Sequence, residues 1–285
     1  MLTDDSTLVS RELKPLIGSV VEADRETLLS GRYGKDIRAL LEERSVLVFP
    51  GVGFDDEEQI AFTQTLGTQA FENNGTLDAD GNKQAVYKVS LDTAVNPQAE
   101  YLKGSFFWHL DGSMHEVPIL ASLLGARRIP AGGAVTEWCN TYAAYDALAD
   151  DDKASLEGLR VVHAAWSIQR HIAPEPSYEA FRHIRAVPSR EQPLVWKHAS
   201  GRKSLVIGST AGYVVGLDTV DSMDLLIRLR DWATQPQFVY RHEWSEGDLV
   251  MWDNTGTLHR AEPYDPMSGR LLHRTMLQGE EPVAA

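Results

Sequence analysis

Two short histidine-bearing segments, separated by about half of the chain, place the tightest constraint on its fold. The first spans residues 108–111 and carries His109 and Asp111; the second spans residues 252–260 and carries His259. Residues i and i+2 of an extended chain point to the same face, so His109 and Asp111 can reach one ion together. A third ligand from the second segment requires that a distant strand lie beside the first in space.

Two imidazoles and one carboxylate make up the facial triad that holds non-haem Fe(II) and leaves coordination positions open. A co-substrate and O2 can bind at those positions. We therefore predict that His109, Asp111 and His259, called here the metal triad, are the catalytic centre of an oxygenase. A His-x-Asp triplet alone is common by chance, and the remaining histidines are interpreted as structural or surface residues: His115, His163, His171, His183, His198, His242 and His273. His273 is expected to be out of register with the pocket.

The charge balance argues against nucleic acid or a membrane as a partner. The 285 residues carry a formal net charge of −14, which repels phosphate backbones and anionic lipids. A local group of arginines can still attract a small anionic substrate. The single cysteine, Cys139, excludes an intrachain disulfide and has no identifiable partner base, so it is not a candidate nucleophile. Residues 1–11 do not resemble a secretory leader, and we expect a cytoplasmic protein.

Short apolar and β-branched runs bounded by turn residues predict many strands. The predicted strands are residues 13–21, 45–49, 85–91, 119–127, 134–138, 160–165, 194–198, 204–207, 238–243, 248–252 and 270–277. Apolar spacing and capping residues predict helices at residues 35–44, 58–66, 141–148, 150–159 and 221–234. Residues 71–83 and 96–104 are expected to be active-site loops, and residues 171–192 a surface insertion. Without a convincing linker, residues 1–285 are predicted to form one mainly β domain, a double-stranded β-helix (jelly-roll, cupin-like) core with flanking helices.

Several motifs occur in an order that resembles a known family. They are Trp108-His-Leu-Asp111, Gly132-Gly-Ala-Val-Thr136-Glu-Trp138, Trp252-Asp-Asn254, His259-Arg-Ala261 and Arg270-Leu-Leu-His-Arg274. Their order is similar to that in the taurine dioxygenase/2,4-dichlorophenoxyacetate dioxygenase (TauD/TfdA) family of Fe(II)/2-oxoglutarate-dependent oxygenases. The resemblance extends from Val46 to Leu277 and implies Fe(II), 2-oxoglutarate and O2 as cofactor and co-substrates.

The resemblance also implies roles for individual residues. The metal triad would ligate iron, and Arg270 would bind the distal carboxylate of 2-oxoglutarate, which a guanidinium can grip through two parallel hydrogen bonds. Thr136 would add a hydroxyl donor to the same carboxylate. Arg274 matches a family arginine that reaches the anionic group of the primary substrate, although it could equally pair with Asp111 or stabilise the 2-oxoglutarate pocket.

Three other motif residues have simpler interpretations. Trp108 and Trp252 are expected to pack beside the site rather than contact substrate. Asn254 either orients the second ligand segment or makes the turn that its side chain favours.

The chain departs from the taurine-oxidising members at positions that contact substrate. Glu72 or a close neighbour stands where those members carry a histidine that contacts the sulfonate, and Ser105 stands where they carry an asparagine. A carboxylate would repel a sulfonate. Residues 101–107 are also more aromatic and apolar than a small zwitterion needs. We therefore expect a larger, partly hydrophobic organic acid, contacted by Glu72, Ser105, Phe107 and Arg274.

The implied reaction is hydroxylation of an unactivated C–H bond, coupled to formation of succinate and CO2. Hydroxylation next to a heteroatom would then cleave a C–O, C–N or C–S bond. Desaturation or cyclisation in secondary metabolism would use the same residues, and an inert jelly-roll metal-binding protein is a further alternative. Asp111 argues against a halogenase, and Arg270 with Thr136 argues against a zinc hydrolase. The resemblance also implies a homo-oligomer, either a dimer or a tetramer.

Overall fold

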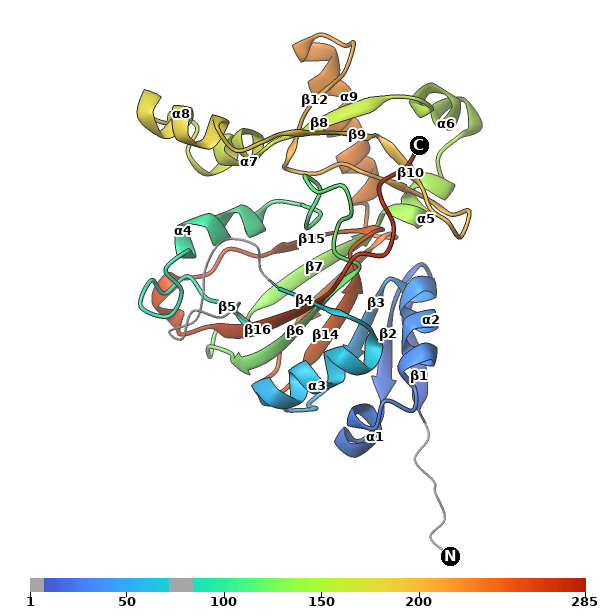
Figure 1. Ribbon diagram of the computed structural model, residues 1–285, viewed down its shortest axis with the longest axis vertical. Coiled ribbons are helices and arrows are strands. Elements are labelled where there is room, and N and C mark those ends of the chain that lie inside the picture. Colours follow the sequence, from blue (N-terminus) through green and yellow to red (C-terminus); the bar gives the residue numbers. More distant parts are fainter. Residues whose placement is uncertain (1–7, 72–84) are drawn as a thin grey trace, which may run out of the picture.

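Two β-sheets packed face to face form the centre of the protein (Figure 1). The computed structural model describes residues 8–71 and 85–285. The larger sheet contains, in spatial order, β1 (Val9–Lys14), β2 (Ile17–Glu22), β3 (Val46–Phe49), β14 (Leu249–Asp253), β6 (Ala121–Arg128), β16 (Leu271–Leu277) and β4 (Gln69–Ala70), and β5 (Tyr87–Val89) also pairs with β16. The smaller sheet has β7 (Val135–Asn140) between β13 (Val239–Glu243) and β15 (Thr257–Ala261).

Aromatic and aliphatic side chains fill the space between the two sheets. The ring centroids of Trp138 and Trp252 lie 5.7 Å apart, and both side chains are almost fully buried. Trp244, Val250 and Leu272 belong to the same cluster. This core fixes the separation of the sheets, and the polar site described below lies between them at one end.

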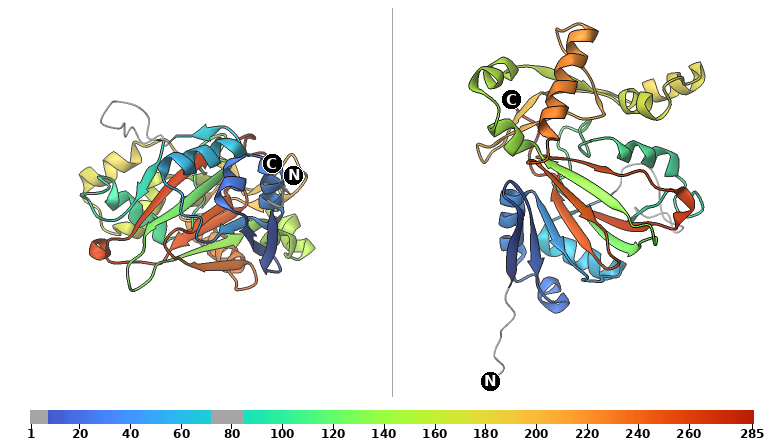
Figure 2. Two further views of the ribbon diagram at one scale, coloured as in Figure 1. Left: turned by 90° about the horizontal axis from the view of Figure 1, so that it is seen from below. Right: turned by 180° about the vertical axis from the view of Figure 1, so that it is seen from behind.

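Three helices cover the outer face of the larger sheet, as Figure 2 shows in blue. They are α1 (Arg25–Leu29), α2 (Gly34–Arg44) and α3 (Asp56–Leu66). Asp55 caps α3 in a reciprocal arrangement with Glu58, in which each side chain accepts from the other residue's backbone N–H. Phe62 of α3 packs edge to face on Phe49 of the sheet, with ring centroids 5.5 Å apart.

A second group of elements gathers at the end of the sheets that is uppermost in Figure 1. It contains two small sheets, formed by β8 (Arg160–His163), β9 (Arg190–Pro193) and β12 (Ala211–Val214), and by β10 (Val195–Lys197) and β11 (Lys203–Leu205). Its helices are α5 (Thr141–Asp146), α6 (Asp150–Leu156), α7 (Ala165–Ile172), α8 (Tyr178–Arg185) and α9 (Thr219–Ala233). The shorter helices α4 (Ala99–Leu102), η1 (Lys103–Phe106) and η2 (Pro266–Ser268) lie in connections. No helix in the described ranges is long and apolar enough to cross a membrane.

The predicted jelly-roll class and most predicted elements are confirmed, and two segments contain helices or strands that were not predicted. Residues 96–104 are not an irregular connection, because Asn96 accepts from Gln98 N–H at 2.9 Å and starts the helical turns α4 and η1. Residues 171–192 are not merely a surface insertion: Ser177 caps α8, and β9 pairs with β8. Of the predicted loop at residues 71–83, all but Phe71 lies outside the described residues.

Candidate metal centre

The three predicted ligands meet at one point although they come from distant parts of the sequence. The ligating atoms of His109, Asp111 and His259 all lie within 4.8 Å of one another. His109 Nε2 is 3.6 Å from Asp111 Oδ1, and His259 Nε2 is 3.8 Å from Asp111 Oδ2. Two imidazoles and a carboxylate in this arrangement can hold one divalent metal ion on one side and leave its other side open.

A short antiparallel pairing holds the two histidines side by side. The backbone N–H of His109 donates to the carbonyl oxygen of His259 at 3.1 Å, and the N–H of His259 donates back at 2.9 Å. Gly208 lies directly against this pair, with φ of +117°, and a Cβ atom there would be 2.9 Å from the carbonyl oxygen of Trp108. Glycine is needed at this position because both the backbone conformation and the close approach exclude a side chain.

Hydrogen bonds from neighbouring groups orient the first ligand segment. Nδ1 of His109 lies 2.8 Å from the carbonyl oxygen of Phe107, so the ring can donate there and turn the Nε2 lone pair toward the metal position. Asn254 donates to the carbonyl oxygen of Asp111 at 2.6 Å and accepts from the Asp111 N–H at 3.2 Å. Of the two roles expected for Asn254, the structure therefore shows that of orienting the ligand segments.

The electrostatic surroundings favour the protonation states that bind a metal. Burial alone would raise the pKa of the Asp111 carboxyl, but Arg274, and then His259 and His109, hold that pKa at about 2. Burial, followed by the proximity of His109, lowers the pKa of His259 well below its usual value. An ionised carboxylate and a neutral imidazole are the forms that coordinate Fe(II), so the residues present fit this ion.

Arg270 is a buried cation at the start of the strand that forms the opposite wall of the site. Its side chain is 3% exposed, and its guanidinium lies over the Tyr264 ring, 4.4 Å from the centroid. No carboxylate of the described residues pairs with it, and its Nε has no hydrogen-bond partner there. Burial lowers the pKa of Arg270, which shows that the protein environment disfavours the charge. A carboxylate-bearing ligand such as 2-oxoglutarate would supply the missing counter-charge.

The other two predicted binding residues also lie between the sheets. Arg274, on β16, places Nη1 2.9 Å from Asp111 Oδ2, which is one of the roles expected for it. Thr136, on β7 of the smaller sheet, is buried, and its hydroxyl accepts from Trp244 Nε1 at 2.9 Å. Because a hydroxyl can accept and donate at once, Thr136 keeps an O–H donor for a ligand.

The other residues expected to contact substrate lie in different parts of the structure. Ser105 lies in η1, and the Phe107 ring packs against His171 with centroids 4.9 Å apart. Glu72 lies outside the described residues. His273 faces away from the site, as expected, with Nδ1 2.6 Å from Asp56 Oδ1 on α3.

Two tryptophans flank the metal triad, and three aromatic residues of the site were not predicted. The Trp252 ring packs on His259 at 4.8 Å, and Trp108 is buried in the hydrophobic core, as expected. The unpredicted residues are Tyr264 beneath Arg270, Tyr87 beneath Arg274 and Trp244 beside Thr136. Their proximity arises from tertiary packing, and the only sequence signal was that Tyr264 shortly precedes Arg270.

Comparison with known proteins assigns the chain to one enzyme family. A family model described as "Taurine catabolism dioxygenase TauD, TfdA family" matches residues 10–276. The chain is 38% identical over 282 residues to the "Alpha-ketoglutarate-dependent 2,4-dichlorophenoxyacetate dioxygenase" of Cupriavidus pinatubonensis, covering 94% of this chain and 96% of that one. It is 33% identical over 275 residues to the "(S)-phenoxypropionate/alpha-ketoglutarate-dioxygenase" of Sphingobium herbicidovorans, covering 94% of each chain.

A solved structure resembles the whole fold. The crystal structure of AAD-2 in complex with Mn(II) and N-oxalylglycine superposes with a TM-score of 0.80 at 30% identity, and the match covers 98% of this chain and 100% of that one. The family match spans nearly the whole chain, and the buried arginine and the metal triad lie within it. The chain therefore belongs to the TauD, TfdA family and is an Fe(II)- and 2-oxoglutarate-dependent dioxygenase.

Proposed function

We propose that this dioxygenase hydroxylates a C–H bond of a small, partly hydrophobic organic acid, with iron held by His109, Asp111 and His259. One observation carries the proposal: the three ligands converge within 4.8 Å beside a strand that presents the buried, carboxylate-free Arg270. The larger sheet thus supplies the cations and the smaller sheet supplies His259 and Thr136. A ligand with two carboxyl ends fits between a metal and a guanidinium.

Each residue has a separate task in the proposed reaction. Bound iron, with 2-oxoglutarate and O2, supplies the oxidising power, and 2-oxoglutarate leaves as succinate and CO2 while one oxygen atom enters the substrate. Arg270 binds the distal carboxylate through its planar N–H donors, and the Thr136 hydroxyl donates to the same group. Asn254 and the Phe107 carbonyl hold the first ligand segment in one orientation, so the side chains of His109 and Asp111 would be ready to bind the ion.

Arg274 supports an organic acid as the substrate. It is a second guanidinium, on β16 and four residues after Arg270, and it already lies against the metal ligand Asp111. A substrate carboxylate bound by Arg274 would therefore be placed next to the metal. The Tyr87 ring, 5.3 Å from the Arg274 guanidinium, and the Phe106 ring, whose centroid is 5.9 Å from that of Tyr264, make this neighbourhood partly apolar. Two relatives are named for phenoxyalkanoic acids, which combine an aromatic ring with a carboxylate.

The cofactor-binding roles can be tested without knowing the substrate. Metal-free protein is titrated anaerobically with Fe(II) and 2-oxoglutarate while the weak visible charge-transfer band of the chelate is recorded. The band should require both additions, weaken strongly in Arg270→Ala and persist in Arg241→Ala, a control that removes an exposed, ion-paired arginine of β13. Absence of a band at saturating concentrations, or equal bands in both variants, would contradict the assignment.

The substrate class needs a separate measurement. Succinate release is measured with a panel of aryloxyalkanoates, medium-chain carboxylates, alkyl sulfates and taurine. We expect turnover with partly hydrophobic carboxylates and little with taurine, because Glu72 and Ser105 replace the side chains that serve a sulfonate in the taurine-oxidising members. Faster turnover of taurine than of any carboxylate would show that the proposed substrate class is wrong.

A further inference from the structure

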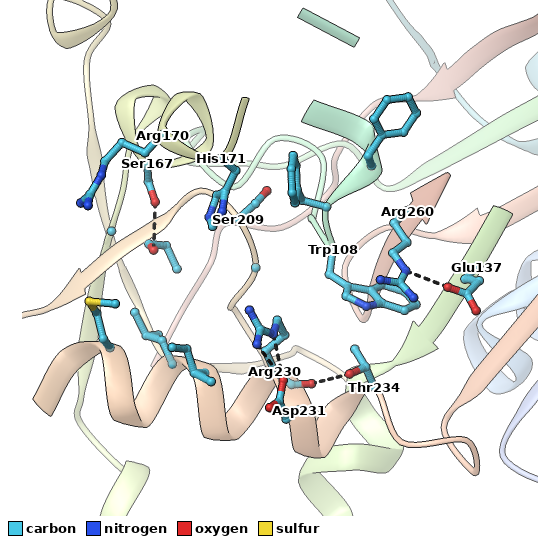
Figure 3. Close-up of a pocket in the computed structure, with 18 of the residues that line it drawn as sticks. Trp108, Glu137, Ser167, Arg170, His171, Ser209, Arg230, Asp231, Thr234 and Arg260 are labelled. Atoms are coloured by element: carbon cyan, nitrogen blue, oxygen red, sulfur yellow. Dashed lines mark hydrogen bonds and ion pairs between the residues drawn. The ribbon is translucent and has the colours of Figure 1, made fainter. Parts of the chain in front are cut away.

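A cavity of about 710 Å³ lies between α7 and α9 (Figure 3). It is on the other side of the strand segments that carry the metal triad. Successive residues of an extended chain face opposite ways, and the cavity is lined by Trp108 and Arg260, the neighbours of His109 and His259. Its other walls come from α7, α9 and the segment 208–212. None of the metal triad, Arg270 and Arg274 contributes to the lining.

Cationic side chains line this cavity from two walls although the chain carries a net charge of −14. Arg170 and His171 of α7 and Arg230 of α9 line it together, and Figure 3 shows Arg230 rising from α9 on the side opposite His171. Within the described ranges, the Arg170 guanidinium forms no hydrogen bond or ion pair. Arg230 binds only its sequence neighbour, Asp231, at 2.8 Å. Burial, then the charge of Arg230 and then that of Arg170, lower the pKa of His171.

Apolar side chains form the remaining wall. Met223 and Ile227 of α9 are 49% and 41% exposed, and both line the cavity together with Phe107 and Trp166. The Trp166 indole is held against Gly212, where an added Cβ atom would be 2.7 Å from the ring. A rigid indole and an exposed aliphatic stripe beside a cluster of cations would favour a ligand that has both an apolar body and a negative end.

We propose that this cavity is a second binding site, distinct from the metal centre, for an amphipathic organic monoanion such as an aryl- or alkylcarboxylate. The volume lies within the range of about 300–1,000 Å³ usual for small-molecule pockets. The apolar body of the ligand packs between Trp166 and the Met223–Ile227 face of α9. Its carboxylate lies between the α7 and α9 walls, where it would give Arg170 an ionic partner and add a second one, beside Asp231, to Arg230. The site requires neither iron nor 2-oxoglutarate, so it stands independently of the proposed function.

Calorimetric titration of the full-length, metal-free protein with 4-phenylbutyrate tests the proposal. Arg170→Gln and Arg230→Gln should each weaken binding at least tenfold, because each removes a charge that faces the carboxylate. Arg228→Gln is the matched control: this residue also lies on α9, pairs with Asp152 at 3.2 Å and does not line the cavity. Its affinity for the probe should stay within twofold of the wild type. Arg274→Gln, a change at the metal centre, should leave this binding event intact.

Other outcomes would overturn the proposal. The absence of saturable binding, or equal losses in Arg228→Gln and Arg230→Gln, would show that the cavity does not select an anion. A loss confined to Arg274→Gln would place the probe at the metal centre instead. The remaining alternative is that the apolar wall is a subunit interface. This holds if sedimentation shows that Ile227→Asp converts a dimer to a monomer and the wild-type protein binds no probe.

Discussion

The side chain of Asn254 hydrogen-bonds both backbone polar groups of Asp111, donating to its carbonyl oxygen at 2.6 Å and accepting from its N–H at 3.2 Å. It also donates to the carbonyl oxygen of Ile119 at 3.2 Å. A single amide therefore ties the turn after β14 to the segment that carries two of the proposed ligands. Its orientation is fixed, because exchanging oxygen and nitrogen would place two carbonyl oxygens against each other.

Replacing Asn254 should weaken metal binding without removing any ligand. In Asn254→Ala we expect the affinity for Fe(II), or for Mn(II) as an air-stable substitute, to fall by about 10–100-fold, the usual effect of losing a residue that orients a ligand. Equilibrium dialysis with metal analysis measures this directly. Asn254→Asp keeps the acceptor but loses the donor, so it should also bind metal more weakly. Unchanged affinity in both variants would show that Asn254 only makes the turn.

Arg270→Gln and Arg274→Gln should affect different ligands although the two residues lie four positions apart in the sequence. Truncating one partner of a buried charge pair costs about 2–5 kcal/mol. Arg270→Gln should therefore raise the KM for 2-oxoglutarate about 30-fold to a few thousandfold, because about 1.4 kcal/mol corresponds to a factor of ten. Arg274→Gln should raise the KM for the organic acid and change that for 2-oxoglutarate much less. Steady-state kinetics with either substrate varied distinguishes the two effects, and the reverse pattern would exchange the two assignments.

Thr136 should contribute to both stability and co-substrate binding, because its hydroxyl accepts from Trp244 and is proposed to donate to 2-oxoglutarate. Thr136→Val leaves Trp244 Nε1 buried without its acceptor, which costs about 1–3 kcal/mol of unfolding free energy in a denaturant titration. It should also raise the KM for 2-oxoglutarate several-fold, whereas Thr136→Ser should preserve both properties. In a Trp244→Phe background the stability cost of Thr136→Val should shrink while the KM effect remains. If the KM effect disappears as well, Thr136 acts only through Trp244.

Asp248 should make the fold sensitive to acid. Burial alone would raise its pKa, but hydrogen bonds from His242, Ser245 N–H and Gly51 N–H lower it overall. Because the native pKa lies below the unfolded value of about 3.9, this stabilisation is complete above that value and is lost as the pH falls through the native pKa.

Denaturant unfolding across the acidic range measures the effect of Asp248. Asp248→Asn should be less stable than the wild type at neutral pH, and its stability should decline less steeply below about pH 4. Asp224→Asn, at an exposed position of α9, should follow the wild-type curve. Identical acid dependence of Asp248→Asn and wild type would contradict the role given to this carboxylate.

Cys139 should be chemically inert in the folded protein. Its side chain is fully buried, and burial raises the pKa of the thiol to about 12. Because the thiolate is the reactive form, a thiol reagent at mildly alkaline pH should not label the native chain but should label one cysteine in denaturant. Cys139→Ala should retain dioxygenase activity. Rapid labelling of the native protein would show that the strand around Cys139 opens readily.

Local sequence patterns predicted the elements whose stability depends on nearby residues. The run of residues 45–49 becomes β3, and Asp55 caps α3 with the reciprocal bond to Glu58. The pattern of apolar residues could not show that Thr257–Ala261 is a strand, because β15 is defined mainly by its pairing with β7. Nor could it show α4, which follows a turn made by Asn96.

The sequence by itself determined the chemistry of the site: two histidines and an aspartate in a recognisable order, followed by two arginines four residues apart. It also determined the family and the jelly-roll class, because these depend on residue types and their order along the chain. Only the tertiary structure decided what surrounds those residues. The stacking of Tyr87 under Arg274, the contact of Arg274 with Asp111, and the second cavity between α7 and α9 all join segments distant in sequence. Such contacts arise from packing between sheets and helices, which periodicity along a single chain does not encode.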